Sequence, residues 1–176
     1  DVWVSPDGDD NNLGTSESEA FLTIGRALEM IAPEDGDPIT INLTEGTFAP
    51  SITGEEFPIL MISNVNLIGQ GKEVTIIDAE QIYGVIYIHN CDNNTISDLT
   101  LTGGSGGGMN LYSSNPILTH VTISNNEAEY SGGGIKLSSS NPTLTHVTIA
   151  NNTANYGGGM RLDNSDPILT HVTISN

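Results

Sequence analysis

The sequence has little positive charge and a single cysteine. Four of its 176 residues are Lys or Arg and 22 are Asp or Glu, so the formal net charge is −18. A chain this acidic repels nucleic acid and anionic lipid, and both are therefore excluded as partners. Cys91 has no second cysteine with which to form a disulfide within the chain. Stability must come from packing and hydrogen bonds, and cations are the natural counterpart of the charge.

Aromatic residues and long apolar runs are also scarce. Phe, Trp and Tyr make up 5% of the chain, and no apolar stretch approaches the roughly 20 residues of a transmembrane helix. We therefore expect no membrane insertion in this segment. The acidity is uneven, because residues 1–80 contain 16 of the 22 acids and a net charge of −14, against −4 for residues 81–176. This local charge density favours cation binding in the first half of the chain.

Residues 106–176 repeat nearly the same sequence three times. The copies begin at Gly106, Gly132 and Gly157, so the period is 26 and then 25 residues. In each copy, short runs of alternating apolar and polar residues are separated by Ser, Asn, Pro and Gly. These runs are too short and too often interrupted for helices, and the leucine-rich-repeat pattern is absent. The repeats predict an all-β fold, a parallel β-helix whose turns stack about 4.8 Å apart.

Stacking of the turns gives each column of the repeat an expected place. Equivalent apolar residues should form inward ladders, and the residues between them should face water. The three inward ladders are Met109, Ile135 and Met160; Leu111, Leu137 and Leu162; and Ile123, Ile149 and Ile174. The column expected to face water is Asn110, Lys136 and Arg161.

The glycine, proline and asparagine residues between the predicted strands should form the corners. The triple glycines suit a corner with positive φ and close backbone stacking, and the prolines suit strand starts. Paired asparagines should form a ladder whose amides bond from turn to turn. The residues concerned are Pro116, Pro142 and Pro167, and Asn125 and Asn126 with Asn151 and Asn152.

Three parts of the chain are expected. Residues 1–37 should form a strand, an acidic turn and a helix, residues 38–105 irregular rungs, and residues 106–176 the regular rungs. The helix is predicted over residues 19–32, with Ser16 or Ser18 as its N-cap. Its apolar face is Phe21, Ile24, Leu28 and Ile31. Because an open β-helix end exposes apolar side chains and strand edges, we interpret this helix as a cap on the first rung.

The third copy stops at Asn176, before its rung is complete. Either further rungs follow in the parent protein, or another subunit covers the last rung. A head-to-tail contact of the chain with itself would build a filament.

The turn after the first strand is a candidate metal site. Asp7, Asp9, Asp10 and Asn12 surround Gly8, and such alternating oxygen ligands suit a hard cation such as Ca²⁺. The full EF-hand spacing is absent, because no Glu occupies the twelfth position. The alternative is a solvated turn rich in Asp and Asn.

His120, His146 and His171 hold the same slot of the three copies and should stack about 5 Å apart. Imidazole is a common metal ligand, so a metal ladder is one interpretation. The same slot holds Asp98 in the preceding rung and Asn64 earlier. Asn, Asp and His are the non-glycine residues enriched in left-handed backbone conformations. We therefore favour a corner residue over a metal site.

The sequence also resembles a known group of proteins. The opening VSPDGDDNNLGTSESEAFLTIGRAL, followed by ITINLTEGTF, resembles the N-terminal region of secreted bacterial and archaeal proteins of the pectin-lyase-like superfamily. The later GGG…NPxLTxVTIxNNxA pattern resembles the repeats of the same group. The resemblance covers the whole chain and implies a right-handed parallel β-helix located outside the cell or on its surface. It implies no single activity, because the superfamily includes lyases, hydrolases, epimerases, adhesins and structural spikes.

A small outward cluster is the candidate for chemistry. It contains Lys136, Arg161 and Asp163, with Tyr112 and Ser138 on neighbouring rungs. By resemblance, lyases of the superfamily use a basic residue beside a uronate carboxylate held by Ca²⁺, and its hydrolases use clustered carboxylates. Here one acid stands beside two cations, and paired carboxylates on adjacent rungs are not apparent in the regular region. We therefore lean against catalysis and name no catalytic residue.

Uniform repeats with little outward chemistry favour a non-catalytic extracellular scaffold, such as an adhesin, surface-layer or filament component, with Ca²⁺ as a stabiliser. The alternative is a carbohydrate-binding or polysaccharide-degrading β-helix protein whose partner is an extracellular polysaccharide. Against this alternative, the negative charge repels polyuronates unless Ca²⁺ bridges them. A groove of aligned acids or aromatic residues would favour the alternative, whereas a bare repetitive surface would favour the scaffold.

Overall fold

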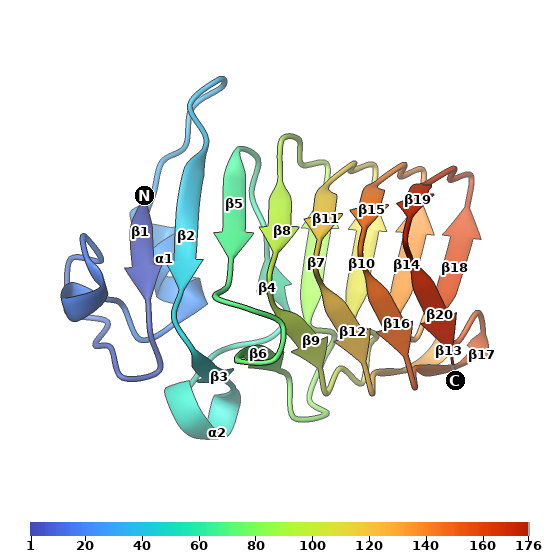
Figure 1. Cartoon of the computed structure of the whole chain (residues 1–176), viewed down its shortest axis with the longest axis horizontal. Helices are drawn as coiled ribbons and strands as arrows, with labels where there is room; N and C mark the ends of the chain where they lie inside the picture. Colours follow the sequence, from blue (N-terminus) through green and yellow to red (C-terminus); the bar gives the residue numbers. More distant parts are fainter. Residues whose placement is uncertain (176) are drawn as a thin grey trace.

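The chain winds into a parallel β-helix in which each turn lies on the preceding one (Figure 1). The structure is a computed structural model that describes residues 1–175. Neighbouring strands of its three large sheets are parallel and about one repeat apart in sequence, so the hydrogen bonding joins turn to turn. The predicted all-β class and parallel β-helix are confirmed.

Three sheets form the walls of the helix (Figure 1). The seven-stranded sheet contains β1 (Val2–Val4), β2 (Ile39–Leu43), β5 (Val65–Ile68), β8 (Thr95–Ser97), β11 (Ile117–Thr119), β15 (Thr143–Thr145) and β19 (Ile168–Thr170). The six-stranded sheet contains β3 (Gly46–Phe48), β6 (Thr75–Asp78), β9 (Thr100–Thr102), β12 (Thr122–Ser124), β16 (Thr148–Ala150) and β20 (Thr173–Ser175). The five-stranded sheet contains β4 (Ile59–Leu60), β7 (Ile86–His89), β10 (Met109–Tyr112), β14 (Ile135–Ser138) and β18 (Met160–Asp163). A fourth, two-stranded sheet pairs β13 (Glu127–Ser131) with β17 (Thr153–Tyr156).

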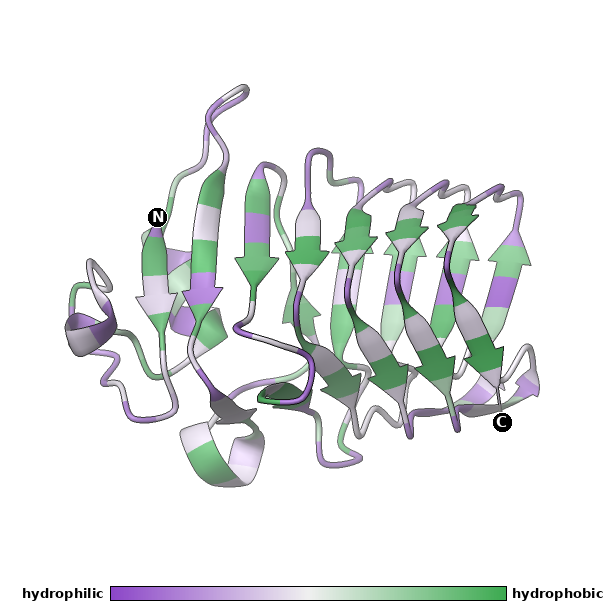
Figure 2. Ribbon diagram, in the orientation of Figure 1, coloured by the Kyte–Doolittle hydropathy of each residue, from purple (hydrophilic) through white to green (hydrophobic). Residues whose placement is uncertain are grey.

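The inward ladders have the predicted register. Met109 pairs with Ile135 and Ile135 with Met160, and the leucine and isoleucine ladders keep the same alignment. The first two members of each ladder are fully buried, and green apolar bands recur from strand to strand in Figure 2. The third copy is less covered, since Leu162 and Ile174 are 43% and 49% exposed. No helix among residues 1–175 has the length and apolar character needed to cross a membrane.

The run at residues 118–123, predicted as one alternating strand, is two strands on two sheets. β11 ends at Thr119 and β12 begins at Thr122, so the chain turns a corner at His120 and Val121. His120 has a φ of 54° there, and Val121 is fully buried. Each regular rung therefore has three wall strands, because a single left-handed residue redirects the chain. The alternation breaks at this corner, where Thr119 and His120 are consecutive polar residues.

The glycine corners are confirmed. Gly107, Gly132 and Gly157 have φ values of 92°, 72° and 62°, a region that residues with a Cβ rarely adopt. Close stacking explains the next glycines, because a Cβ on Gly134 would lie 2.4 Å from the carbonyl oxygen of Gly159 on the next turn.

Buried side-chain ladders support the other corners. Asn126 donates through Nδ2 to the Oδ1 of Asn152, 3.0 Å away, and both residues are buried. This confirms the predicted turn-to-turn amide ladder for Asn126 and Asn152. Asn125 and Asn151, predicted to share it, are instead exposed residues with φ values of 56° and 54°. A second ladder, formed by serine hydroxyls, accepts backbone N–H groups: Ser140 Oγ bonds the Ser114 amide, and Ser165 Oγ bonds the Ser140 amide. The prolines immediately precede the strands β11, β15 and β19, as predicted.

The N-terminal helix is shorter than predicted. α1 spans Ile24–Met30, preceded by a single 3₁₀ turn at Glu17–Glu19, so the predicted range of residues 19–32 is wrong at both ends. Phe21 instead bridges Val4 as strand-like backbone. The expected capping by Ser16 or Ser18 is also wrong, because Thr23 is the N-cap and its hydroxyl accepts the Arg26 amide.

The predicted apolar face of this segment does meet the core. Phe21 and Ile24 are buried, and Leu28 and Ile31 pack against the buried cluster. α1 contacts β1 and β4 at the N-terminal end of the β-helix (Figure 1). Its role as a cap on the first rung stays a prediction.

Two carboxylates from distant parts of the chain determine where α1 begins. Asp10 Oδ1 accepts the amides of Leu22 and Thr23 at 2.8 and 2.9 Å. Glu55, which follows the short helix α2 (Pro50–Thr53), accepts the amides of Ile24 and Gly25 at 2.6 and 2.9 Å. Together they satisfy the amides at the start of the helix, which have no partner within the helix. This start cannot be found from local sequence.

Candidate functional site

The acidic turn is partly incorporated into the fold. Besides its two backbone contacts, Asp10 accepts the Thr23 hydroxyl at 2.9 Å. Asn12 donates its side-chain amide to the Ala20 carbonyl at 2.9 Å. Asp9 accepts the Asn11 amide, and this hydrogen bonding by Asn11 holds the pKa of Asp9 below its usual range. Asp7 is exposed.

The predicted calcium ligands therefore lie close together in sequence but have different roles. Asp10 and Asn12 bond within the fold, whereas the carboxylates of Asp7 and Asp9 are at the surface. Among residues 1–175, no group of three or more His, Cys, Asp and Glu side chains is arranged to hold a metal. Calcium binding at Asp7, Asp9, Asp10 and Asn12 stays a prediction.

The histidine column forms a corner, as predicted. His120, His146 and His171 have φ values of 54°, 54° and 52°, and Asp98 and Asn64 in the same slot have 57° and 61°. The rings stack with centroids 5.1 and 4.8 Å apart. Since all five residues share the left-handed conformation, the backbone explains the choice of Asn, Asp and His.

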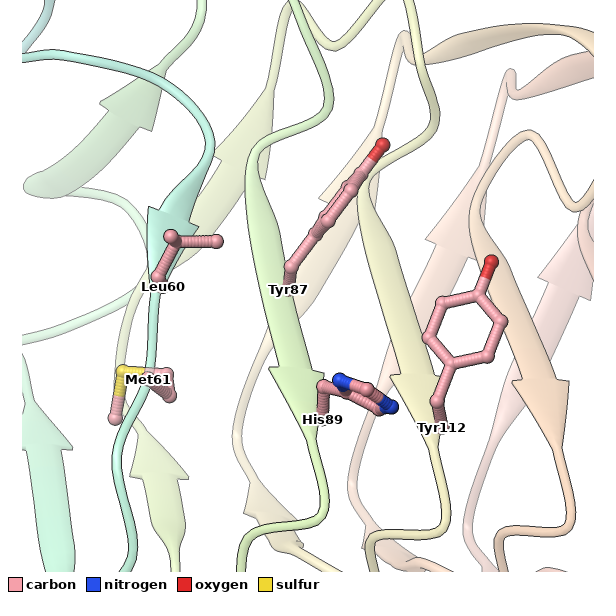
Figure 3. A pocket seen from close by; sticks show the side chains of 5 residues that line it. All are labelled: Leu60, Met61, Tyr87, His89 and Tyr112. Atoms are coloured by element: carbon pink, nitrogen blue, oxygen red, sulfur yellow. The ribbon is translucent and has the colours of Figure 1, made fainter.

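A cavity lies on the outward face of the five-stranded sheet. Its volume is about 510 Å³, and we call it the aromatic pocket after its lining residues, Leu60, Met61, Tyr87, His89 and Tyr112 (Figure 3). The residues come from β4, β7 and β10 and from the residue that follows β4. His89 and Tyr112 meet edge to face, with ring centroids 6.0 Å apart. Burial raises the pKa of Tyr87.

Basic side chains continue the same face toward the C-terminus. Lys136 on β14 pairs in register with Arg161 on β18, and its Nζ lies 5.8 Å from the centroid of the Tyr112 ring. Ser138 and Asp163 continue the column of Tyr112. Asp163 is the one acid among the strand residues of this sheet. Two of the four Lys and Arg residues of the chain therefore lie on one face.

The prediction that Asn110 faces water is wrong. Asn110 is 4% exposed, because its side-chain amide turns onto the backbone and donates to the Gly106 carbonyl at 3.0 Å. Lys136 is half-buried and Arg161 is exposed.

The aromatic pocket was not predicted from sequence, although the cluster beside it was: Lys136, Arg161, Asp163, Tyr112 and Ser138. Tyr87 and His89 belong to an irregular rung, and only the register of β7 with β10 places His89 beside Tyr112. The alternation in Ile86–His89 contained this information, since it places Tyr87 and His89 on the outward face.

Chemically, this face is suited to binding a chain of acidic sugars. Aromatic rings offer apolar faces with polar edges, and Lys and Arg pair with carboxylates. Glycoside hydrolysis by two carboxylates is not supported by the strand residues of this face, where Asp163 stands alone.

The parallel pairing of strands from turn to turn defines the chain as a parallel β-helix protein. Residues 6–175 match the family described as protein of unknown function DUF1565, and the chain belongs to this family. No curated protein matches the chain.

Several solved structures share the fold at low identity. A pectate lyase, Pel9A, matches with a TM-score of 0.70 and 15% identity, over 97% of this chain and 46% of its own. The pectin methylesterase PemA from Erwinia chrysanthemi matches with a TM-score of 0.52 and 13% identity, over 89% and 54%. A rhamnogalacturonan lyase matches with a TM-score of 0.52 and 14% identity, over 97% and 50%. The chain thus spans about half the length of these structures.

Proposed function

We propose that this chain is an extracellular, non-catalytic β-helix domain that binds an acidic polysaccharide along the outward face of its five-stranded sheet. The observation that carries the proposal is the juxtaposition of the aromatic pocket with Lys136 and Arg161 on one face. A groove with aromatic residues is the feature that favours a carbohydrate-directed role over a bare scaffold. The names of the similar structures, all enzymes of pectin or rhamnogalacturonan, support the substrate class.

The geometry suggests how a uronate chain is held. Tyr87 and Tyr112 line the pocket from adjacent strands and offer surfaces on which sugar rings pack. Lys136 and Arg161 lie on the next two strands, each about 4.8 Å further along the axis, where carboxylates of the same chain come within reach. These cations offset, on this face alone, the repulsion that a charge of −18 exerts on a polyanion.

In this proposal the domain acts as a non-catalytic scaffold that holds the polysaccharide. The strands of this sheet supply no pair of carboxylates, and its five strands form a rigid platform built from turn-to-turn hydrogen bonds. Adhesion to an extracellular polysaccharide needs such a platform and no chemistry. An extracellular or cell-surface location follows from the proposed partner.

Calcium binding at the acidic turn is a separate part of the proposal. Asp7 and Asp9 have carboxylates at the surface, in a region where the charge density is high. Calorimetric titration with CaCl₂ tests it. Heat that disappears in the Asp7→Asn/Asp9→Asn double variant supports binding there, and the same heat in both proteins contradicts it.

The polysaccharide proposal is tested by binding of sodium polygalacturonate, with dextran as the neutral control. Tyr112→Ser and Lys136→Asn introduce residues that the same columns already contain, at Ser138 and Asn110. We expect each to weaken binding about tenfold, the loss of roughly one charged or stacking contact. Binding should weaken with added salt, because a carboxylate–cation contact at a surface is screened.

Lys72→Asn is the matched control, since it removes the same charge from a loop before β6 instead of from the five-stranded sheet. If Lys72→Asn weakens binding as much as Lys136→Asn does, net charge and not the proposed face is responsible. Release of new reducing ends from polygalacturonate, with or without CaCl₂, would contradict the non-catalytic part of the proposal.

A further inference from the structure

We propose that a second cavity, on the outward face of the seven-stranded sheet, binds a neutral sugar residue. The cavity has a volume of about 520 Å³ and lies between the loop at residues 34–38 and the first residues of β5, β8 and β11. This loop projects beyond the sheet at the upper end of β2 in Figure 1. Five asparagines line the cavity: Asn64, Asn66, Asn93, Asn94 and Asn115. We call it the asparagine cavity. It is on a different wall from the aromatic pocket and does not depend on the polysaccharide proposal.

Hydrogen bonds fix the orientation of the amides at the ends of this cavity. Asn93 donates through Nδ2 to Asn64 Oδ1 at 2.9 Å, and Asn64 donates in turn to Asp35 Oδ1 at 3.0 Å. This relay ends on a carboxylate, which can only accept when ionised, so both side chains have one defined orientation.

Two further amides have their oxygens occupied and their NH₂ groups available. Asn66 Oδ1 accepts the Thr95 amide at 3.1 Å, and Asn115 Oδ1 accepts the Asn141 amide at 2.6 Å. Within residues 1–175 no acceptor is found for the Nδ2 of either side chain. The cavity therefore presents two oriented hydrogen-bond donors to a ligand.

Asn94 lines the cavity from beneath and is the fifth asparagine of the lining. It is 2% exposed, and its Nδ2 donates to the carbonyls of Ile62 and Val65 at 2.7 and 2.9 Å. Its Oδ1 is the one buried side-chain polar atom among the described residues that lacks a hydrogen-bond partner. Buried acceptors of this kind are rare. This oxygen has almost no accessible surface, so a ligand in the cavity meets the donors of Asn66 and Asn115 instead of Asn94.

Comparison with the next rungs shows that this asparagine is a local departure from the repeat. Ile117 bonds through its amide to the Asn94 carbonyl, so Asn94 occupies the position that Pro116 holds before β11. The regular rungs thus have a proline, with no side-chain polar group, where this rung has an unpaired amide oxygen. The Nδ2 of Asn94 bonds two carbonyls of the preceding rung, a contact that a proline at this position could not make.

The side chains that line the cavity indicate which class of ligand it can bind. No Lys, Arg, Asp or Glu lines the cavity, and Asp35 lies at its edge, which disfavours an anion. Available NH₂ donors disfavour a cation. Ile117, 49% exposed at the start of β11, and the exposed Pro38, just before β2, add apolar surface to the lining. A neutral pyranose offers hydroxyls that accept from the amides and C–H groups that contact apolar side chains. The volume lies within the range of about 300–1,000 Å³ of small-molecule sites.

The test uses the full chain and four neutral probes: the methyl glycosides of glucose, galactose, mannose and rhamnose. Side-chain amide resonances are followed by NMR during each titration. We expect at least one glycoside to shift the NH₂ signals of Asn66 and Asn115. Asn115→Asp keeps the oxygen that accepts the Asn141 amide and removes the donor, so it should weaken binding about tenfold.

The chain supplies its own controls. Asp166 already occupies the equivalent ladder position two rungs further on, so an aspartate is compatible with this column. Asn141→Asp makes the identical change one rung beyond the cavity and should leave binding unchanged. Tyr112→Ser, in the aromatic pocket, should also leave it unchanged, which separates this site from the polygalacturonate face.

Three results would overturn the proposal. The first is that none of the four glycosides binds more tightly than about 10 mM. The second is an equal loss of affinity in Asn115→Asp and Asn141→Asp, which would point to charge and not to the missing donor. The third is a shift of the same amide signals by CaCl₂ alone, which would make the cavity a cation site.

Discussion

Glu55 should make the protein less stable as the pH rises from about 4.5 to about 7. The side chain is 2% exposed beneath the start of α1, and burial raises its pKa from 4.5 to about 7 although two backbone amides donate to it. Between these values the native state binds more protons than the unfolded state, so the free energy of unfolding falls with pH. The contribution is fully present below about pH 4.5 and lost above about pH 7. A shift of this size corresponds to about 3 kcal/mol.

The perturbation that isolates this effect is Glu55→Gln. Glutamine has nearly the same shape and no titration, but its NH₂ group meets one of the two amides of Ile24 and Gly25. We expect a pH-independent cost of about 1–3 kcal/mol from that unsatisfied donor. The advantage of the wild-type protein over the variant should therefore be largest at pH 4 and should shrink by about 3 kcal/mol by pH 8.

The assay is urea unfolding followed by circular dichroism from pH 4 to pH 8. Repulsion within a chain of net charge −18 also lowers stability as pH rises. Glu56→Gln is the control, since it removes the same charge from the exposed neighbouring residue. The reasoning is refuted if the wild-type and Glu55→Gln curves run parallel with pH, or if Glu56→Gln changes the pH dependence as much.

Three further predictions concern the fold around the sites. Gly134→Ala should lower the free energy of unfolding by about 1–3 kcal/mol or more, because its Cβ meets the Gly159 carbonyl, and urea midpoints will measure this. His146→Asn should be nearly neutral, whereas His146→Val should cost about 1–2 kcal/mol in thermal unfolding, since a β-branched residue resists a φ of 54°. Asp10→Asn should destabilise the protein by about 1–2 kcal/mol in EDTA as well as in CaCl₂, because Asp10 accepts the amides of Leu22 and Thr23 and the hydroxyl of Thr23, the N-cap of α1. A loss seen only with calcium would make Asp10 a metal ligand instead.

The repeating interior could be predicted from sequence because one period sets many positions at once. Once Met109, Ile135 and Met160 are aligned, the parallel register follows, and so do the turn-to-turn partners of Asn126. The left-handed corner was predictable because Asn, Asp and His share one slot, and few constraints other than φ select those three residues together.

Features built from distant segments could not be predicted in this way. The start of α1 depends on Asp10 and Glu55, and the latter lies 31 residues from the amide that it accepts. The corner between β11 and β12, by contrast, left a signal in the sequence, because the alternation of residues 118–123 breaks at the consecutive polar residues Thr119 and His120. The asparagine cavity needs the loop at residues 34–38 to lie beside a strand that begins at Ile117.

Departures from the repeat separate function from architecture in this chain. The histidine column varies only among residues that its φ allows, so its variation needs no ligand to explain it. Tyr87 stands where Asn110 and Lys136 follow, a change on the outward face that does not improve the packing of the core. Asn94 stands where the next rung has Pro116, and there the change adds hydrogen bonds to the carbonyls of Ile62 and Val65. Both lie at cavities, on different walls. Where one rung has a different residue from its neighbours and the difference does not stabilise the fold, binding of an outside partner best explains that residue. The repeat also supplies the test, since returning such a position to the residue of its neighbour should remove binding while the fold persists.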